Sequence, residues 1–270
     1  MGADRRLDGQ SQSLERGLAI LSTFQPGRPL LGVSELSREM GLSRSTAHRY
    51  IITLARLGYL QQDPSTRKYR LGPRVLDLGF SAINSMELRE ISAPHLQQLS
   101  DSTGHTVNMA ILDGTDIVYI ERCRSASRGQ REIDLNLHVG SRLPAYCTSM
   151  GKVLLAYLPE PARRELLDGI ELVQRGPNTL IAMAELVAEL ERVREAGLAV
   201  NNEELAFGLR SIAAPVRGST REIVAAINLA VHRSWGSLED LVERLSPTLR
   251  HAAAEISARL GYRPDPPRLH

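Results

Sequence analysis

The chain has 270 residues, more than the ~100–200 of a typical single domain, so we expect two domains. Its composition is that of a globular protein, and it has neither an apolar run of ~18 residues nor a signal sequence, which excludes membrane-spanning and exported classes and predicts a cytoplasmic protein with no membrane partner. The net charge of +2 is uneven, because residues 1–72 contain eleven Lys and Arg against six Asp and Glu, and this excess indicates that the first part meets a polyanion.

The first predicted elements are three helices. Apolar residues recur at helical spacing over residues 14–24, and a short second helix runs from a cap at Ser34 to Gly41, where glycine takes the left-handed C-cap conformation at little cost. The third helix begins at Ser43, a favoured N-cap residue type, and ends at Gly58. An apolar stripe of this helix faces a core and consists of Ala47, Tyr50, Ile51, Leu54 and Leu57.

Polar side chains occupy the start of the third helix, mostly away from that stripe. They are Ser43, Arg44, Ser45, Thr46, His48 and Arg49. A short helix, a tight turn at glycine and a second helix with a polar first half are typical of a helix-turn-helix, whose second helix presents its N-terminal residues to base edges in the major groove. We therefore predict that these six residues contact DNA.

Two short β segments follow, at residues 58–62 and 68–71, around the turn sequence DPST. They resemble the wing of a winged helix, in which basic side chains meet phosphates. The basic residues here are Arg67, Lys68 and Arg70. The helices, the turn, the wing and the basic charge together predict a winged helix-turn-helix DNA-binding domain over residues 1–72.

A helical pattern that starts at Pro73 predicts a linker helix over residues 73–91, followed by a second domain over residues 92–270. Residues 105–123 alternate around an Asp-Gly turn, a strong hairpin signal, and residues 131–137 indicate a third strand. Helices and further strands alternate irregularly after that, which predicts an α+β sheet domain. The predicted helices of this part are SMGKVLLAYL, AMAELVAELERVREAG and SLEDLVERLSPTLRHAAAEISARLG.

Several ordered motifs resemble the IclR-type transcriptional regulators. In the first domain they are SLERGLAIL, VSELSREMGLSRSTAHRYIITLARLGYL and YRLGPRVLDLG, and in the second they are PAYCTSMGKVLLA, GLRSIAAPV and IVAAINLAVH. The resemblance runs from about Ser13 to Leu260 and implies an N-terminal winged helix-turn-helix joined by a linker helix to a GAF-like α/β effector-binding domain. Three of the motifs are similar in sequence to those of the branch that controls aromatic-acid catabolism through protocatechuate and β-ketoadipate.

The resemblance also implies an effector pocket, between the sheet and the helix that begins in TSMGKVLLA. Matching segments place in it Leu135, Ser149, Met150, Asn201, Leu209, Ser211, Asn228 and Ala230. Members that bind small oxo-acids are expected to carry an acid at the Asn201 position and a thiol at the Ser211 position, so this set favours a planar aromatic acid such as a hydroxybenzoate. The free N–H groups at the helix start near Ser149 suit its carboxylate. A small oxo-acid or another metabolite stays open as the alternative.

An enzyme with an accessory DNA-binding domain is the alternative from another class. Cys147 with His138, or Ser149 with Lys152, could pair a nucleophile with an activator, but neither pair lies in a local catalytic signature. The two cysteines, Cys123 and Cys147, lack the spacing of a zinc site or a disulfide framework, and no GxGxxG opening a helix, P-loop or HExxH occurs. We therefore predict no enzymatic activity, no cofactor and no metal.

The predicted mechanism couples two binding events. A homodimer or a dimer of dimers binds a roughly palindromic operator in double-stranded DNA through recognition helices ~34 Å apart. Effector binding in the second domain changes this affinity by ~1–3 kcal/mol through the linker helix, in repression or in activation. A sensor that has lost its ligand, leaving DNA binding indifferent to small molecules, stays open as a third possibility.

Overall fold

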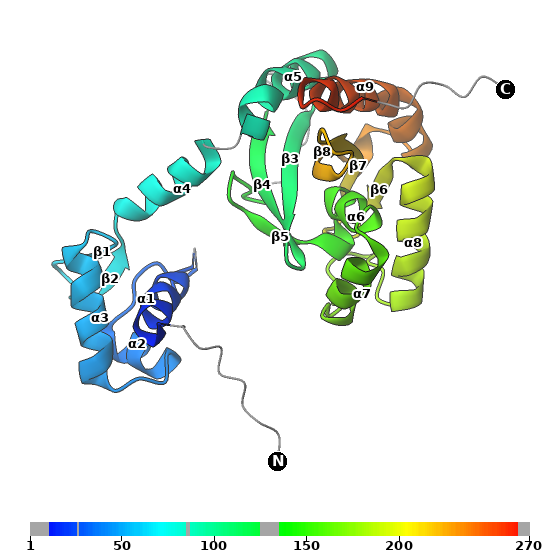
Figure 1. Ribbon diagram of the computed structural model, residues 1–270. Helices are drawn as coiled ribbons and strands as arrows, with labels where there is room; N and C mark the ends of the chain where they lie inside the picture. The colour runs from blue at the N-terminus through cyan, green and yellow to red at the C-terminus, as the bar shows by residue number, and fades with distance from the viewer. Residues whose placement is uncertain (1–10, 26, 85–86, 125–134, 264–270) are drawn as a thin grey trace. The chain divides into compact units, whose positions relative to one another are not determined.

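The computed structural model describes residues 11–25, 27–84, 87–124 and 135–263. The contacts divide the chain into two units, Met1–Ser85 and Met86–His270 (Figure 1). Among the helices of the described residues, none is both long enough and apolar enough to cross a membrane. The same residues contain no group of three or more His, Cys, Asp or Glu side chains that could hold a metal ion.

The first unit is a winged helix-turn-helix, as the sequence predicts. Its elements in chain order are α1 (Gln12–Ser22), α2 (Val33–Glu39), α3 (Arg44–Arg56), β1 (Leu60–Gln62), β2 (Tyr69–Leu71) and α4 (Arg74–Asn84). The buried core that joins the helices to the wing consists of Ile20, Leu31, Leu36, Ile51, Leu60 and Tyr69. Because α3 buries Ala47 and Ile51 on one side, most polar side chains of its first two turns are left exposed.

The cap predictions for this unit have different outcomes. The N-cap of α3 is confirmed, because Ser43 is extended and its hydroxyl accepts from the Thr46 N–H at 3.2 Å. The glycine turn is also confirmed, with Gly41 at φ +60°. The predicted cap at Ser34 is wrong, because the N-cap of α2 is Gly32, two residues earlier, and the helix begins at Val33. The N–H of Gly32 donates to the Glu35 carboxylate at 2.7 Å and fixes the helix start there.

The wing is tied to the helices by backbone hydrogen bonds. Strands β1 and β2 pair antiparallel, with Leu60 opposite Leu71. Leu31, in the segment before α2, exchanges two bonds with Tyr69 of β2: its N–H donates at 2.9 Å and its carbonyl accepts at 2.8 Å. The wing therefore continues into the segment that leads to α2.

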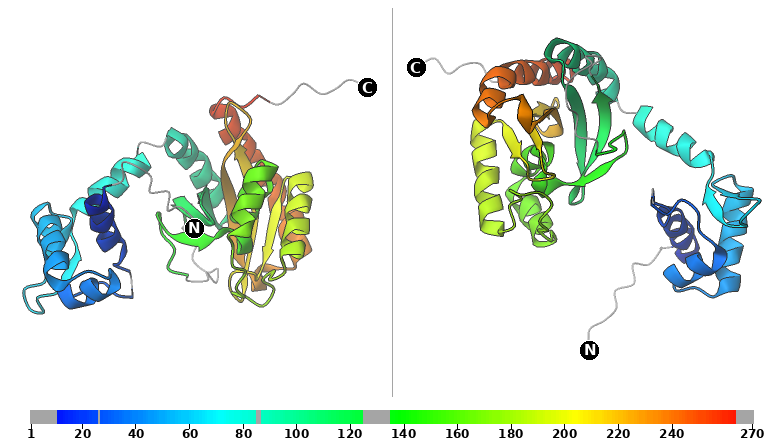
Figure 2. Two further views of the ribbon diagram at one scale, coloured as in Figure 1. Left: turned by 60° about the horizontal axis from the view of Figure 1, so that its bottom comes forward. Right: turned by 180° about the vertical axis from the view of Figure 1, so that it is seen from behind.

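The second unit is a six-stranded antiparallel sheet with helices on both faces (Figures 1 and 2). The strands lie in the order β5 (Arg142–Pro144), β4 (Asp116–Cys123), β3 (Thr106–Asp113), β8 (Ile223–His232), β7 (Leu209–Arg217) and β6 (Ala199–Asn202). One face packs on α5 (Glu87–Thr103) and α9 (Leu238–Arg259). The other packs on α6 (Ser149–Ala156), α7 (Glu160–Asp168) and α8 (Met183–Ala196). This layered arrangement confirms the predicted α+β domain.

The predicted β3–β4 hairpin is confirmed, with Asp113 opposite Asp116 and Gly114 at φ +60° in the two-residue loop. The third strand expected at residues 131–137 is not found where the structure describes it. Residues 131–134 lie outside the described residues, and 135–137 are not in a strand, since Asn136 has φ +49° and leaves the extended conformation. The strand that pairs with β4 is instead β5.

The predicted linker range, residues 73–91, covers the end of one unit and the start of the other. Helix α4 ends at Asn84, and α5 begins at Glu87. Helix α5 packs on the sheet of the second unit through Leu96 and Leu99. The second half of the range therefore starts the second unit, and α4 is the segment that remains as a connection.

Candidate nucleic-acid interface and ligand pocket

The exposed face of α3 carries most of the residues predicted to read DNA. Arg44, Ser45, His48 and Arg49 are exposed in the first two turns. Thr46 is half-buried, and its hydroxyl lies 2.8 Å from that of Ser43, so these two groups are engaged in capping the helix. Two guanidinium groups and an imidazole are thus the long polar side chains that the first two turns of α3 present.

The three basic wing residues differ in their surroundings. Arg67 is exposed in the turn between β1 and β2. The Lys68 ammonium lies 3.1 Å from the Glu35 carboxylate of α2, and the Arg70 guanidinium donates to Gln61 at 3.1 Å. Of the three, Lys68 would have to leave an ion pair in order to bind a phosphate.

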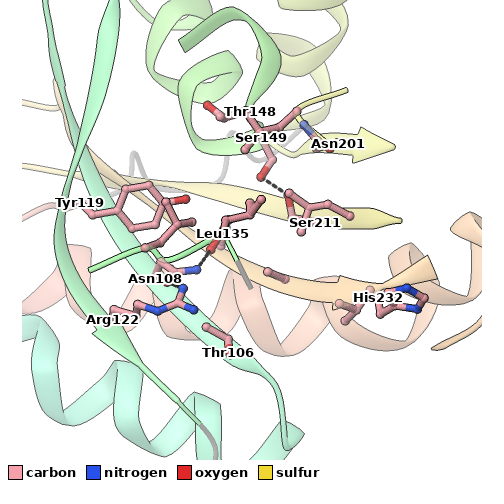
Figure 3. A pocket seen from close by; sticks show the side chains of 16 residues that line it. Thr106, Asn108, Tyr119, Arg122, Leu135, Thr148, Ser149, Asn201, Ser211 and His232 are labelled. Atoms are coloured by element: carbon pink, nitrogen blue, oxygen red, sulfur yellow. Dashed lines mark hydrogen bonds between the residues drawn. The ribbon is translucent and has the colours of Figure 1, made fainter. Parts of the chain in front are cut away.

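A cavity opens on the α6 side of the sheet in the second unit (Figure 3). Its volume is ≈ 70 Å³, which is room for several water molecules. The lining residues are Thr106, Asn108, Tyr119, Arg122, Leu135, Leu137, Thr148, Ser149, Asn201, Leu205, Leu209, Ser211, Asn228, Ala230, Val231 and His232. All the residues predicted for the pocket are in this set except Met150, which is fully buried in the core under α6.

Strand register explains why residues from distant parts of the chain meet here. One row crosses the sheet from β6 to β3 and consists of Asn201, Ser211, Ala230 and Thr106, each opposite the next. A second row consists of Asn228, Asn108 and Arg122 on β8, β3 and β4. Because alternate residues of a strand share a face, both rows lie on the floor of the cavity.

The α6 end of the cavity is formed by hydroxyl groups. Ser149, the first residue of α6, has its Oγ 2.7 Å from the Oγ of Ser211. Thr148 caps the helix by accepting from the Gly151 N–H at 3.1 Å. The helix start that was expected to hold a carboxylate therefore already uses one of its N–H groups within the protein.

Asn201 is held by the surrounding backbone. Its amide nitrogen donates to the Cys147 carbonyl at 2.6 Å, and its amide oxygen accepts from the Glu204 N–H at 3.3 Å. Glu204 is itself buried and receives a hydrogen bond from Lys152 at 2.7 Å. Burial raises the pKa of the Glu204 carboxyl, and the Lys152 ammonium partly offsets that rise. Asn201 thus connects the cavity floor to a buried ion pair.

Arg122 was not predicted as a pocket residue, and a β-bulge places it on the same face of the sheet as Tyr119. Met109 lies opposite Glu121 but Ala110 lies opposite Tyr119, so Ile120 is an extra residue in β4. Strict alternation would put Arg122 and Tyr119 on opposite faces, whereas both line the cavity. Glu121 turns to the other face, where its carboxylate lies 2.8 Å from Arg89 of α5. Nothing in the sequence signals this bulge.

Three side chains of the possible catalytic pairs are either hydrogen-bonded within the protein or unreactive. Cys147 is fully buried, and burial raises the pKa of its thiol to about 12, so it carries almost no thiolate at neutral pH. Ser149 bonds to Ser211, and Lys152 bonds to Glu189 and Glu204. None of these three side chains is an activated nucleophile in this arrangement.

Two family descriptions match the chain: the IclR helix-turn-helix domain over residues 13–64, and the C-terminal part of the bacterial transcriptional regulator IclR over residues 80–258. The chain belongs to the IclR family of transcriptional regulators. Its members are regulators rather than enzymes, which removes the enzymatic alternative. The IclR assignment also agrees with the two units described above.

Three IclR relatives show how far the similarity extends. The Pca regulon regulatory protein of Pseudomonas putida is 37% identical over 92% of this chain and 84% of its own length. A solved structure from Rhodococcus sp. RHA1 is 39% identical, with a TM-score of 0.78 over 93% of this chain and 98% of that one. An IclR homologue from Microbacterium hydrocarbonoxydans, solved in complex with 4-hydroxybenzoate, is 26% identical, with a TM-score of 0.78 over 92% of this chain and 99% of that one.

Proposed function

We propose that this regulator controls genes of aromatic-acid catabolism and that its effector is a hydroxybenzoate. The observation that carries the proposal is the composition of the cavity. Its lining combines apolar and aromatic side chains with two rows across the sheet that are rich in Ser, Thr, Asn and Arg side chains. A flat ring with polar groups at its edges matches such a cavity. The large apolar and aromatic side chains in this lining include Tyr119, Leu135, Leu137, Leu205 and Leu209.

Two relatives support this choice. The Pca regulon regulator is 37% identical, and the Microbacterium homologue was solved with 4-hydroxybenzoate bound. A small oxo-acid is the second candidate, but it has fewer atoms to contact the apolar side chains of the lining. Because buried amides lose hydrogen bonds when a ligand hydroxyl is missing, an analogue without it should bind more weakly by ~1–3 kcal/mol.

For the DNA side we propose a dimer in which each α3 reads one half of a roughly palindromic operator. The support comes from large apolar side chains exposed on two helices, Leu14 and Leu18 of α1 and Leu76 and Leu78 of α4. Exposed apolar groups of this kind mark association surfaces. A dimer of dimers would use further surfaces of the second unit.

The effector and the operator would be linked through α4. A ligand shifts an equilibrium only by its different affinity for the two states, so the effector must favour one arrangement of the DNA-binding units over another. The expected coupling is ~1–3 kcal/mol, or about 5–150-fold in operator affinity.

The proposal is tested by titrating the full chain with the DNA upstream of its own gene at fixed salt, with and without each acid. We expect 4-hydroxybenzoate or protocatechuate to change the affinity and to bind more tightly than benzoate in calorimetry, and benzoate more tightly than pyruvate. Tighter binding of pyruvate or glyoxylate would replace the aromatic effector with an oxo-acid. DNA binding that no acid changes would instead identify a sensor without a ligand.

A further inference from the structure

We propose that Arg122 binds the carboxylate of the effector, and that the ligand's hydroxyl lies at the other end of the cavity, between Ser149 and Ser211. This rests on the proposed function, that the cavity takes an acid. It reverses the orientation expected from the helix start alone. In Figure 3, Arg122 lies together with Asn108 and Thr106, while Ser149 and Ser211 lie at the α6 end.

The first argument is charge. Among the described residues that line the cavity there is no Asp or Glu, and Arg122 is the one side chain of permanent charge. A carboxylate leaving water loses its hydration and needs a cationic or multiply donating partner in return. Guanidinium is the group best matched to a carboxylate, since its N–H groups form a planar fork.

The second argument is the direction of the hydrogen bonds along the row. Arg122 donates from Nη1 to the Asn108 amide oxygen at 2.8 Å, and Asn108 donates from its amide nitrogen to the Asn228 amide oxygen at 2.8 Å. Both amide oxygens thus accept within the row. The Asn228 amide nitrogen is then the group of that side chain that can serve a ligand, and it is a donor. This part of the cavity floor therefore suits an acceptor such as a carboxylate.

The third argument is the contrast with the α6 end. The hydroxyls of Ser149 and Ser211 lie 2.7 Å apart, and either can be the donor. Such a pair can both give and receive a hydrogen bond, which suits a neutral hydroxyl. Thr148 already accepts from the Gly151 N–H there. The two ends of the cavity are thus different in charge and in hydrogen-bonding character.

The test compares ligand pairs that differ only in charge, measured by calorimetry on the full-length protein. The pair is 4-hydroxybenzoate and 4-hydroxybenzamide, and the variants are Arg122→Gln, Arg122→Lys and Ser149→Ala. We expect the wild type to prefer the acid by about tenfold or more, because charged hydrogen bonds are the stronger ones. Arg122→Gln should lose that preference, and Arg122→Lys should keep part of it.

Ser149→Ala is the matched control at the other end. It should keep the preference for acid over amide and lose part of the preference for 4-hydroxybenzoate over benzoate. The proposal is overturned if Arg122→Gln, shown to be folded by its unchanged melting temperature, prefers the acid as strongly as the wild type does. It is also overturned if Ser149→Ala abolishes that preference. If Arg122→Gln is unfolded, the folded Arg122→Lys and Ser149→Ala proteins decide by the same comparison.

Failure of the proposed function has a separate signature. If the wild type binds pyruvate and no hydroxybenzoate, the aromatic effector is wrong, and the pair pyruvate and pyruvamide then tests Arg122 in the same variants. If the wild type binds no acid at all, both proposals fall together.

Discussion

The ammonium group of Lys152 lies 2.7 Å from the carboxylate of Glu204, and both side chains are almost wholly buried. Lys152 belongs to α6, while Glu204 follows β6, so the ion pair fastens the helix to the far end of the sheet. The Glu204 N–H also donates to Asn201 in the cavity floor. The position of this part of the floor therefore depends on a charge pair that does not line the cavity.

Replacing Lys152 with Met should destabilise the second unit by about 3–5 kcal/mol, because it leaves Glu204 buried without its countercharge. Urea unfolding followed through Trp235, the single tryptophan of the chain, measures this. Arg192→Met is the control, since the Arg192–Glu189 pair has its arginine exposed and such pairs contribute about 0–1 kcal/mol. Equal losses in the two variants would contradict the importance of burial.

The loss in Lys152→Met should also depend on pH. Burial raises the pKa of Glu204 above its ordinary 4.5, and Lys152 lowers it again in part, so the variant protonates Glu204 at higher pH than the wild type. A charged Glu204 without its countercharge destabilises the folded variant, and the carboxyl is charged at pH values above its pKa in that variant. The difference from the wild type should therefore be larger at pH 8 and shrink as the pH falls toward 5. A loss that is constant with pH would mean that Glu204 is not the group left unpaired.

Gly151→Ala should disrupt the α6 end of the cavity. A Cβ there would lie 2.1 Å from the Ala145 carbonyl oxygen, so the helix start must move away from the segment before it. We expect a loss of about 1–3 kcal/mol, typical of overpacking, together with weaker effector binding. Gly169→Ala meets only an ordinary contact at 3.6 Å and serves as the control. Unchanged effector affinity in a folded Gly151→Ala protein would remove the helix start from the pocket.

Arg44→Ala and Arg49→Ala should each weaken specific operator binding by about 1–3 kcal/mol if the side chain reads a base. Ser45 and Thr46 variants should lose less, Thr46 because its hydroxyl bonds to Ser43. Arg56→Ala removes the same charge from the last turn of α3 and is the control. Footprints on operator and scrambled DNA separate the cases. If the Arg44 and Arg49 variants bind like the Arg56 variant, α3 does not read bases through its first turns.

Arg67→Ala should reduce the salt dependence of binding rather than its specificity. A phosphate contact releases condensed counterions, so its loss lowers the magnitude of the slope of log K against log salt by about 0.9. Lys68→Ala should change the slope less, because that lysine is already paired with Glu35. Titrations at several salt concentrations measure both slopes. An unchanged slope with an altered base preference would show that Arg67 reads sequence instead.

Local features of this chain could be predicted because their causes are local. Ser43 caps α3, and Gly114 turns the hairpin, through interactions with residues within a few positions along the chain. Arg122 could not be placed, because an inserted Ile120 reverses the alternation of β4 without any turn-forming residue to mark it. Asn201 was predicted to line the pocket, but its hydrogen bond to the Cys147 carbonyl could not be foreseen, because Cys147 is distant in sequence. Met150 was misplaced relative to the cavity because a helix start indicates which residues are near, not which of them face inward.

Two backbone hydrogen bonds join Leu31 to Tyr69 of the wing, and Tyr69 is buried in the same core as Ile51 of α3. The wing and α3 therefore form one DNA-binding unit. We expect this unit to present the same hydrogen-bond donors to DNA whether or not an effector is bound. The effector can then alter only the separation and angle between the two DNA-binding units of a dimer. It should leave the bases preferred within each half-site unchanged and shift the preferred number of base pairs between half-sites, so that promoters respond differently through their spacing alone.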